Sequence, residues 1–276
     1  MRALILVMGL VLAAPACAYH LPVWEFGLGA ATLRLPPYRG AKGQDYYALP
    51  VPYLAYRGDI VKIDEEGVRG EVYQGPRVQL DFSLAGNVPV HGDKHSARAG
   101  MRNLDPVGEA GPAMNVFLFQ TGDGHGKGEN QFWLRLPMRA VVSVGDPLLE
   151  HQGWVFSPYL DWVWRRETGG SHWRTSLAVG PIFASRRYHD YFYEVTTKDI
   201  TPQRSEYHPG AGYSGSRITF TYSLNTRHWF IGAFARYDDL RNAEFVDSPL
   251  VETKRYFAMG VAVMKIFAHS KAHAPH

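Results

Sequence analysis

The chain has 276 residues, and its 46% hydrophobic and 13% aromatic content excludes a disordered or collagen-like protein. Its 29 basic and 26 acidic residues leave a formal charge of only +3, which is unlike a dedicated nucleic-acid binder. The mean hydropathy of −0.23 is too polar for a bundle of membrane helices.

The first 18 residues predict a secretory signal peptide. Arg2 precedes an apolar run, 3–14, that is too short to span a bilayer core of ~30 Å. Ala16-Cys17-Ala18 is a small-residue cleavage site. Cleavage after Ala18 removes the single cysteine, so the mature chain is expected to have no thiol and no disulfide. Lipoprotein processing at Cys17 is the alternative.

The remaining chain is a series of strands with two unlike faces. In 78–85, Leu80, Phe82 and Leu84 alternate with Gln79 and Asp81, the period of 2 that is typical of a half-buried strand. No stretch of 18 apolar residues occurs after the leader, and no long stretch repeats with a helical period. Similar runs cover 24–34, 48–57, 60–73, 108–120, 132–142, 154–165, 172–183, 213–224, 228–239 and 254–267.

These runs fit two architectures, a soluble β-sandwich and a membrane β-barrel. Runs of about 10 residues match the length of a tilted membrane-spanning strand. Tyr and Trp near the run ends suit a membrane interface, as at Trp24, Tyr56, Trp154 and Trp229. Together with the leader, these features favour a closed antiparallel transmembrane β-barrel in the outer membrane, over residues 19–267, followed by a His-containing tail, 268–276.

The strand count is predicted as 12, with 10 as the lower bound. Eleven runs are visible, and the turn composition of DEEGVRG divides 60–73 into a hairpin. Single-chain bacterial barrels have an even strand count and both chain ends in the periplasm. This topology places 87–107, 186–212 and 239–253 outside as long loops, and makes 57–59 and 225–227 short periplasmic turns.

Facing the polar residues inward puts many charges in the lumen. Because unpaired buried charges are costly, interior ion pairs that plug a narrow barrel are the favoured interpretation over a conducting, anion-preferring pore. The predicted lumen-lining charges are Arg135, Arg139, Arg165, Arg174, Arg217 and Arg236, with Asp81, Glu109, Asp161 and Asp238.

The loop 186–212 combines aromatic and basic side chains, which are common anchors of protein interfaces. It either offers these residues to a partner or folds into the barrel mouth as a lid, and the sequence leaves both possibilities open. The candidate contact residues are Tyr188, Tyr191, Phe192 and Tyr193.

No pattern of catalysis stands out. GYSGS, at 212–216, has the wrong spacing for the G-x-S-x-G of a serine hydrolase, so we expect no enzyme and no cofactor. His269, His273 and His276 in the tail, and His91 and His95 in a loop, could bind zinc or copper weakly. Solvated histidines are the favoured interpretation, so no metal site is predicted.

Several stretches stand out in order along the chain: PPYRGAKGQDYYALPVPYLAYRGD (36–59), GMRNLDPVGEAGP (100–112), YHDYFYEVT (188–196), GYSGS and RYDDLRNAEFVDSPLVETKRYFAMGVAVMKIF (236–267). Together they resemble the MltA-interacting protein (MipA/OmpV) family of Gram-negative outer membranes. The resemblance implies an outer-membrane barrel without known catalytic residues. It also implies a scaffold role in murein synthesis, with a lytic transglycosylase and a penicillin-binding protein as partners. A narrow passive pore or a surface adhesin or antigen is the alternative function.

Overall fold

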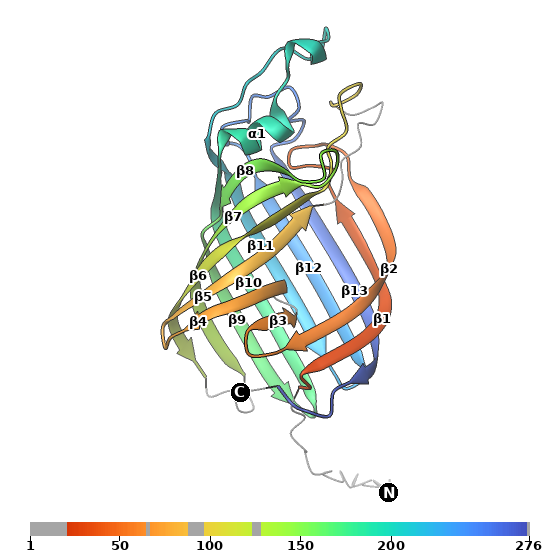
Figure 1. Cartoon of the computed structure of the whole chain (residues 1–276), viewed down its shortest axis with the longest axis vertical. Helices are drawn as coiled ribbons and strands as arrows, with labels where there is room; N and C mark the ends of the chain where they lie inside the picture. Colours follow the sequence, from red (N-terminus) through yellow and green to blue (C-terminus); the bar gives the residue numbers. More distant parts are fainter. Residues whose placement is uncertain (1–20, 65–66, 88–96, 123–127, 275–276) are drawn as a thin grey trace, which may run out of the picture.

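The computed structural model describes residues 21–64, 67–87, 97–122 and 128–274. The predicted leader, His91, His95 and His276 lie outside the described residues. The chain forms a closed antiparallel β-barrel with a small helical cap at one end (Figure 1). Its strands are β1 (Trp24–Leu35), β2 (Asp45–Arg57), β3 (Val61–Asp64), β4 (Gly67–Gln74), β5 (Val78–Asn87), β6 (Val107–Thr121), β7 (Glu129–Ser143), β8 (Glu150–Phe156), β9 (Tyr159–Thr168), β10 (Ser171–Ala184), β11 (Gly212–Asn225), β12 (Trp229–Asp239) and β13 (Arg255–His269).

These thirteen segments form twelve strands around the barrel, which confirms the predicted count. β8 pairs with the end of β7 and β9 pairs with its beginning, so β8 and β9 are two halves of one strand. The break falls at Ser157 and Pro158, and Pro158 has no N–H for a ladder hydrogen bond. The predicted division of 60–73 is also confirmed, because β3 and β4 form a hairpin.

The two faces of β5 and β13 lie as the alternation predicts. On β5, Leu80, Phe82 and Leu84 are 40–49% exposed on the outside, whereas Asp81 is buried inside. β13 repeats the pattern, with Phe257 exposed and Ala258 buried. An outer band of exposed apolar side chains around a charged interior is the arrangement of a barrel that faces lipid.

The barrel closes where the first and last strands meet. β1 pairs with β13 from Glu25↔His269 to Arg34↔Met259. Gly29 permits this close approach, because a Cβ there would lie 2.0 Å from the carbonyl oxygen of Val263. The ladder continues past the strands: the amide of Val23 donates to Ala272, and Pro22 forms a bridge with His273. The tail is therefore an extension of the closing strand as far as it is described.

A second boundary is much shorter. β3 has four residues and pairs with β2 only at Tyr56↔Ile63 and Arg57↔Lys62. On the far side of the hairpin, the β4–β5 ladder ends at Arg69↔Ser83. Among the described residues, no strand pairs with the second edge of β2 over 45–55 or of β5 over 84–87. We call this boundary the β2–β5 seam; Figure 1 shows the short hairpin below it.

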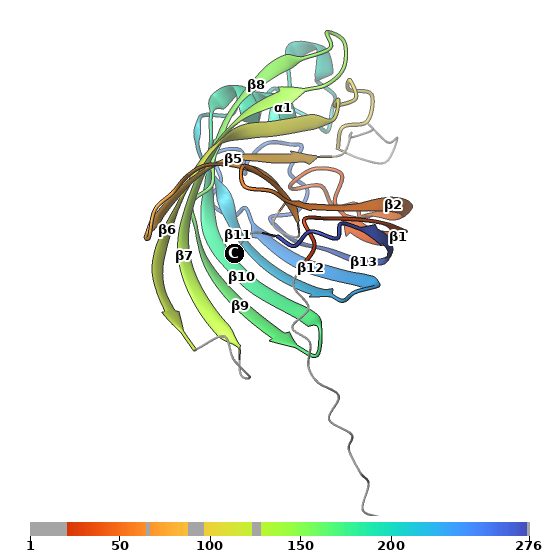
Figure 2. The same cartoon turned by 60° about the horizontal axis from the view of Figure 1, so that its bottom comes forward.

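The two ends of the barrel differ. Both described chain ends lie at one end, where the turns between strands are short, as seen when this end is brought forward in Figure 2. The opposite end carries the long connections, with α1 (Arg186–Tyr193) and the 3-10 turn η1 (Thr197–Asp199). By the usual orientation of such barrels, the end with short turns is periplasmic. No helix in the described part of the chain is long and apolar enough to cross a membrane.

Candidate functional site

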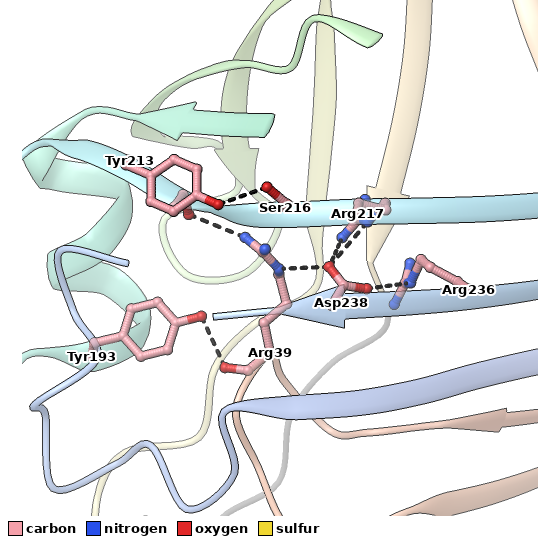
Figure 3. A network of polar contacts seen from close by, with 8 residues as sticks. Arg39, Tyr193, Tyr213, Ser216, Arg217, Arg236 and Asp238 are labelled. Carbon is pink, nitrogen blue, oxygen red and sulfur yellow. Dashed lines mark hydrogen bonds and ion pairs between the residues drawn. The ribbon is translucent and has the colours of Figure 1, made fainter. Parts of the chain in front are cut away.

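The barrel lumen holds a network of charges centred on Asp238 of β12, whose side chain is fully buried (Figure 3). Its Oδ1 accepts hydrogen bonds from Arg217 Nη2 at 3.0 Å and from Arg39 Nε at 3.3 Å. Its Oδ2 forms an ion pair with Arg236 Nε at 3.1 Å. Three guanidinium groups around one carboxylate leave an excess of positive charge in this part of the lumen.

Arg39 is the member of this network that sequence reasoning missed. It lies in the connection between β1 and β2, so no strand periodicity could assign it to the lumen. Arg39 also donates from Nη1 to Ser214 Oγ at 3.1 Å, and its carbonyl accepts from Tyr193 Oη at 2.9 Å. It therefore joins the barrel wall to the cap.

A cavity of about 320 Å³ lies on one side of the lumen, between β4 and β11. Arg135 Nε donates to Asp161 at 2.9 Å, and Arg139 Nε donates to Ser83 Oγ at 3.0 Å. Asp81 accepts from Asn115 at 2.6 Å. We call this side the polar wall; its charged members are Arg69, Arg135, Arg139, Arg174 and Arg217 with Asp81 and Asp161.

The other predicted charges occupy the same interior. Arg165 donates to Gln131 at 2.7 Å, near the periplasmic end of β9. Glu109 lies 3.7 Å from Arg139. Arg174 is 8% exposed and lines both the polar cavity and a second one. Several of the predicted charges are thus paired, Arg135 with Asp161 and both Arg217 and Arg236 with Asp238, and Arg165 contacts the neutral Gln131.

The second cavity, of about 370 Å³, is bounded mainly by apolar groups. It lies against β11, β12, β13 and β1. The inward residues of β2, on the same side of the barrel, continue this surface. We call this side the apolar wall; its members are Ala31, Leu33, Leu49, Val51, Phe230, Phe234, Gly260 and Ala262.

A cluster at the periplasmic end was also not foreseen from the sequence. Glu25 of β1 is fully buried and accepts from Arg57 Nη2 at 2.7 Å. Asn225 and Tyr53 donate to the same carboxylate oxygen, at 3.1 and 3.2 Å. The alternation on β1 indicates that Glu25 faces inward, but its partners come from β2 and β11, and only the barrel register brings them together.

The mouth of the barrel is covered by α1 and by the segment 240–253. Tyr193 stacks on Phe245 with ring centroids 3.7 Å apart, and both rings are buried. Tyr188 and Phe192 are 5% exposed, and Tyr191 packs against this cluster. The candidate contact residues of the loop therefore form the packed interior of a cap.

Burial in the cap shifts the titration of its side chains. Removal from water raises the pKa of Tyr188 to about 12. It lowers the pKa of His189, and the nearby charge of Arg39 acts in the same direction. His189 Nδ1 lies 2.7 Å from the carbonyl oxygen of Gly210, so the neutral ring with a proton on Nδ1 satisfies this contact.

The stretches that carry the family resemblance meet at this mouth. Tyr38 Oη donates to the carbonyl of Leu250 at 2.8 Å, and Ser248 Oγ donates to the carbonyl of Tyr193 at 2.8 Å. With the Arg39–Asp238 pair, these contacts link segments that lie 55 to 212 residues apart in the chain. Residues from several of the stretches that resemble the family therefore hold the cap in place.

The structure bears on two chemical possibilities raised by the sequence, a serine nucleophile and a metal site. Ser214 of GYSGS is buried and accepts a hydrogen bond from Arg39, a cation that cannot take up its proton as a general base would. Within the described ranges, no cluster of three or more His, Cys, Asp or Glu side chains is arranged to hold a metal ion.

A closed 12-stranded barrel with an apolar outer band and a charged interior defines an integral outer-membrane protein. Comparison with known protein families identifies the family within this class. The chain belongs to the family described as MltA-interacting protein MipA, whose model matches residues 28–267. The protein accordingly lies in the outer membrane.

Individual relatives are distant. An outer membrane protein of Vibrio anguillarum, Omp26La, is 23% identical over 206 residues, which cover 66% of this chain and 77% of that protein. Among solved structures, a bacterial polysaccharide outer membrane secretin is 8% identical with a TM-score of 0.31, and covers 91% of this chain and 99% of its own. OmpT of Vibrio cholerae is 8% identical with a TM-score of 0.24, over 88% and 97%. OccK8 (OprE) of Pseudomonas aeruginosa is 8% identical with a TM-score of 0.23, over 78% and 68%.

Proposed function

We propose that this protein is a non-enzymatic scaffold that holds murein-synthesising machinery at the outer membrane. The observation that carries the proposal is the family itself, whose description names an interaction with MltA. We propose a lytic transglycosylase as the first partner and a penicillin-binding protein as the second. The lumen is consistent with this role, because several of its charges are held in ion pairs, Arg135 with Asp161 and three arginines with Asp238.

The periplasmic end is the surface that such a partner can reach. Among the described residues it includes the short turns at 58–60, 75–77, 169–170 and 226–228, together with the paired chain ends. Arg77 and Arg227 are exposed there. Murein lies on this side of the membrane, so a partner that binds the capped end could not act on it. We therefore place the docking surface on the turns.

The test measures binding of a purified lytic transglycosylase to the detergent-folded protein. We expect saturable binding, weakened at least tenfold by the double change Arg77→Glu and Arg227→Glu. The matched control is Arg102→Glu with Arg186→Glu, two exposed arginines at the opposite end, and it should leave affinity unchanged. Absence of binding to the unaltered protein, or equal weakening by both double variants, contradicts the proposal.

A narrow anion pore is the second candidate function. The observation that favours it is the polar wall, on which five arginines face two aspartates. Bilayer conductance measured across a salt gradient distinguishes the two roles. A reversal potential that indicates anion preference supports the pore, whereas a cation-selective or electrically silent bilayer contradicts it.

A further inference from the structure

We propose that the lumen binds a single-chain amphiphile with an anionic head, and that this ligand enters sideways from the bilayer through the β2–β5 seam. The polar wall would hold the head and the apolar wall would hold the acyl chain. Three observations carry this inference: the edge chemistry of β2, the division of the lumen into two walls, and the position of Arg174 between them.

The free edge of β2 is adapted to remain unpaired. The amide of Arg57 donates to Val23, so odd-numbered residues of β2 direct their backbone groups toward β1. The β1–β2 ladder has no bulge, and even-numbered residues therefore direct theirs toward the seam. Pro50 and Pro52 occupy two of these positions and have no N–H to leave unsatisfied. Prolines on a sheet edge prevent pairing with another strand.

The seam faces lipid. Outward-pointing Leu54 on β2 and Leu84 on β5 are 52% and 49% exposed. Four residues of β3 cannot cross a bilayer that requires about 9 to 11 residues per strand, so the hairpin forms only the lower part of this wall. Acyl chains in the membrane therefore meet the barrel at the place where its ladder is shortest.

Behind the seam, β2 presents apolar side chains to the lumen. Arg57 and Ala55 are buried on the inner face of β2, so Val51 and Leu49 point inward as well. Leu49 is nevertheless 46% exposed, so nearly half of its surface remains uncovered inside the barrel. Hydrocarbon that covered such a surface would be stabilised there, because apolar area on both sides would be removed from water.

The polar cavity borders the seam from inside, and the apolar cavity reaches β1, the strand next to β2. The polar cavity extends to Val68, Arg69 and Leu84 on β4 and β5, and the apolar cavity extends to Leu33 on β1. Each has a volume within the ~300–1,000 Å³ typical of small-ligand sites. Arg174 lines both cavities, so an anionic head beside it would leave its chain free to lie along the apolar wall.

The test measures saturable binding of radiolabelled oleate, below its micellar concentration, to the detergent-folded full-length mature protein. Ala262→Phe fills the apolar cavity, and Val263→Phe places the same ring on the lipid face of the same strand as a control. Arg174→Gln removes the head contact, and Arg166→Gln on the outward face of β9 is its control. Heat-dependent gel mobility verifies that each variant is folded.

We expect oleate to bind at one site, with affinity reduced at least tenfold by Ala262→Phe and by Arg174→Gln and unchanged by either control. Neutral oleyl alcohol should bind more weakly than oleate and should not respond to Arg174→Gln. Displacement of oleate by lysophosphatidylglycerol at a lower concentration than unlabelled oleate identifies a phospholipid-derived ligand, and the reverse order identifies a fatty acid. No saturable binding, or equal effects of Ala262→Phe and Val263→Phe, overturns the proposal.

A photoreactive fatty acid in vesicles tests the lateral route. We expect labelling of inward-facing residues on β2 and β13 when the probe is supplied from the bilayer. Labelling confined to the outward residues of these strands overturns the route through the seam.

Discussion

The two edges of β2 differ in how they are held to their neighbouring strands, and the difference shows how this barrel is kept closed. One edge pairs with β1 along its whole length, whereas the other pairs with β3 at only two positions. β3 is joined to β2 by a short turn and cannot separate from it even where hydrogen bonds are few. β1 and β13 share no turn, and the described residues hold them together by the ladder, its extension into the tail and the Phe26–Phe267 ring contact. A long ladder thus stands where the chain provides no covalent link, and a ladder of two pairs suffices where a turn joins the strands.

The largest effect is expected from breaking the Asp238 network, on the side of the barrel formed by β11 and β12. Asp238→Asn leaves Arg39, Arg217 and Arg236 without their carboxylate. Breaking a buried ion pair in this way costs about 3–5 kcal/mol. The free energy of unfolding in urea should fall by that amount. Asp239→Asn, whose pair with Arg241 is partly exposed, is the control and should change it by less than about 1 kcal/mol.

A charge on the lipid-facing surface of β5 tests the side of the barrel next to the β2–β5 seam. Leu80→Arg on β5 should reduce stability in the membrane by about 2–4 kcal/mol if Leu80 lies near the midplane. The neighbouring Asp81→Asn points into the lumen and should leave membrane assembly intact. Both variants are compared by insertion into vesicles, and equal tolerance would mean that the assignment of the two faces is wrong.

A bulky residue at the closing boundary tests the close approach of β1 and β13. In Gly29→Val the new Cβ meets backbone atoms of Val263 and Met264, which cannot move aside. Overpacking of this kind costs typically about 1–3 kcal/mol. The control is Gly108→Val on β6, where a Cβ meets nothing within 4 Å. The folded fraction on a semi-native gel should fall for the first variant alone.

Hydrogen exchange without any mutation sharpens the comparison between the two edges of β2. Amides of Tyr47, Leu49 and Val51 point toward β1 and should be protected. Those of Tyr46 and Ala48 point to the seam and should exchange at least tenfold faster. Residue-resolved exchange by NMR in detergent measures the difference. Uniform protection along β2 would show that another strand or segment pairs with the seam.

The smallest expected effect concerns the cap. Burial lowers the pKa of His189, so between that value and the unfolded value of about 6.5 the unfolded state binds more protons. Cap stability therefore decreases as the pH falls through about 6.5. His208, whose pKa is raised by Glu194 and Glu206, acts in the opposite direction, and its contribution is lost as the pH rises through the raised value.

Tryptic cleavage within 186–212 at pH 7.5 and 5.5 measures this effect. In a His208→Gln background, cleavage relative to that of an unstructured reference peptide at the same pH should be faster at the lower pH, and the further change His189→Gln should remove this dependence. A pH response that persists in the double variant would assign it to other groups.

The sequence predicts much of this fold because a barrel strand shows its environment in its own alternation. Val78 to Leu84 is sufficient to assign a lipid face and a lumen face without knowledge of any neighbour. The twelve-strand count follows from the same signal and from the turn composition near Gly67. The shortness of the β2–β3 ladder does not follow, because the turn composition of 64–70 divides the run but only pairing shows where the ladder stops.

The site is less predictable because it depends on register between distant segments. Arg217 and Arg236 can be assigned to the lumen from periodicity, but their shared contact with Asp238 requires β11 and β12 to align. Arg39 lies outside any periodic segment. Tyr193 is equally compatible with a surface loop or a buried cap until Phe245, 52 residues further on, is placed against its ring.

The pairing of Glu25 with His269 has a consequence for biogenesis. The first strand made by the ribosome finds its second neighbour only in the last, 244 residues later, so closure cannot begin during synthesis or export. Until the final residues arrive, β1 carries an open edge that is prone to pair with other chains. Truncation of a few C-terminal residues should therefore harm assembly more than stability, by delaying the one step that protects the nascent barrel from aggregation.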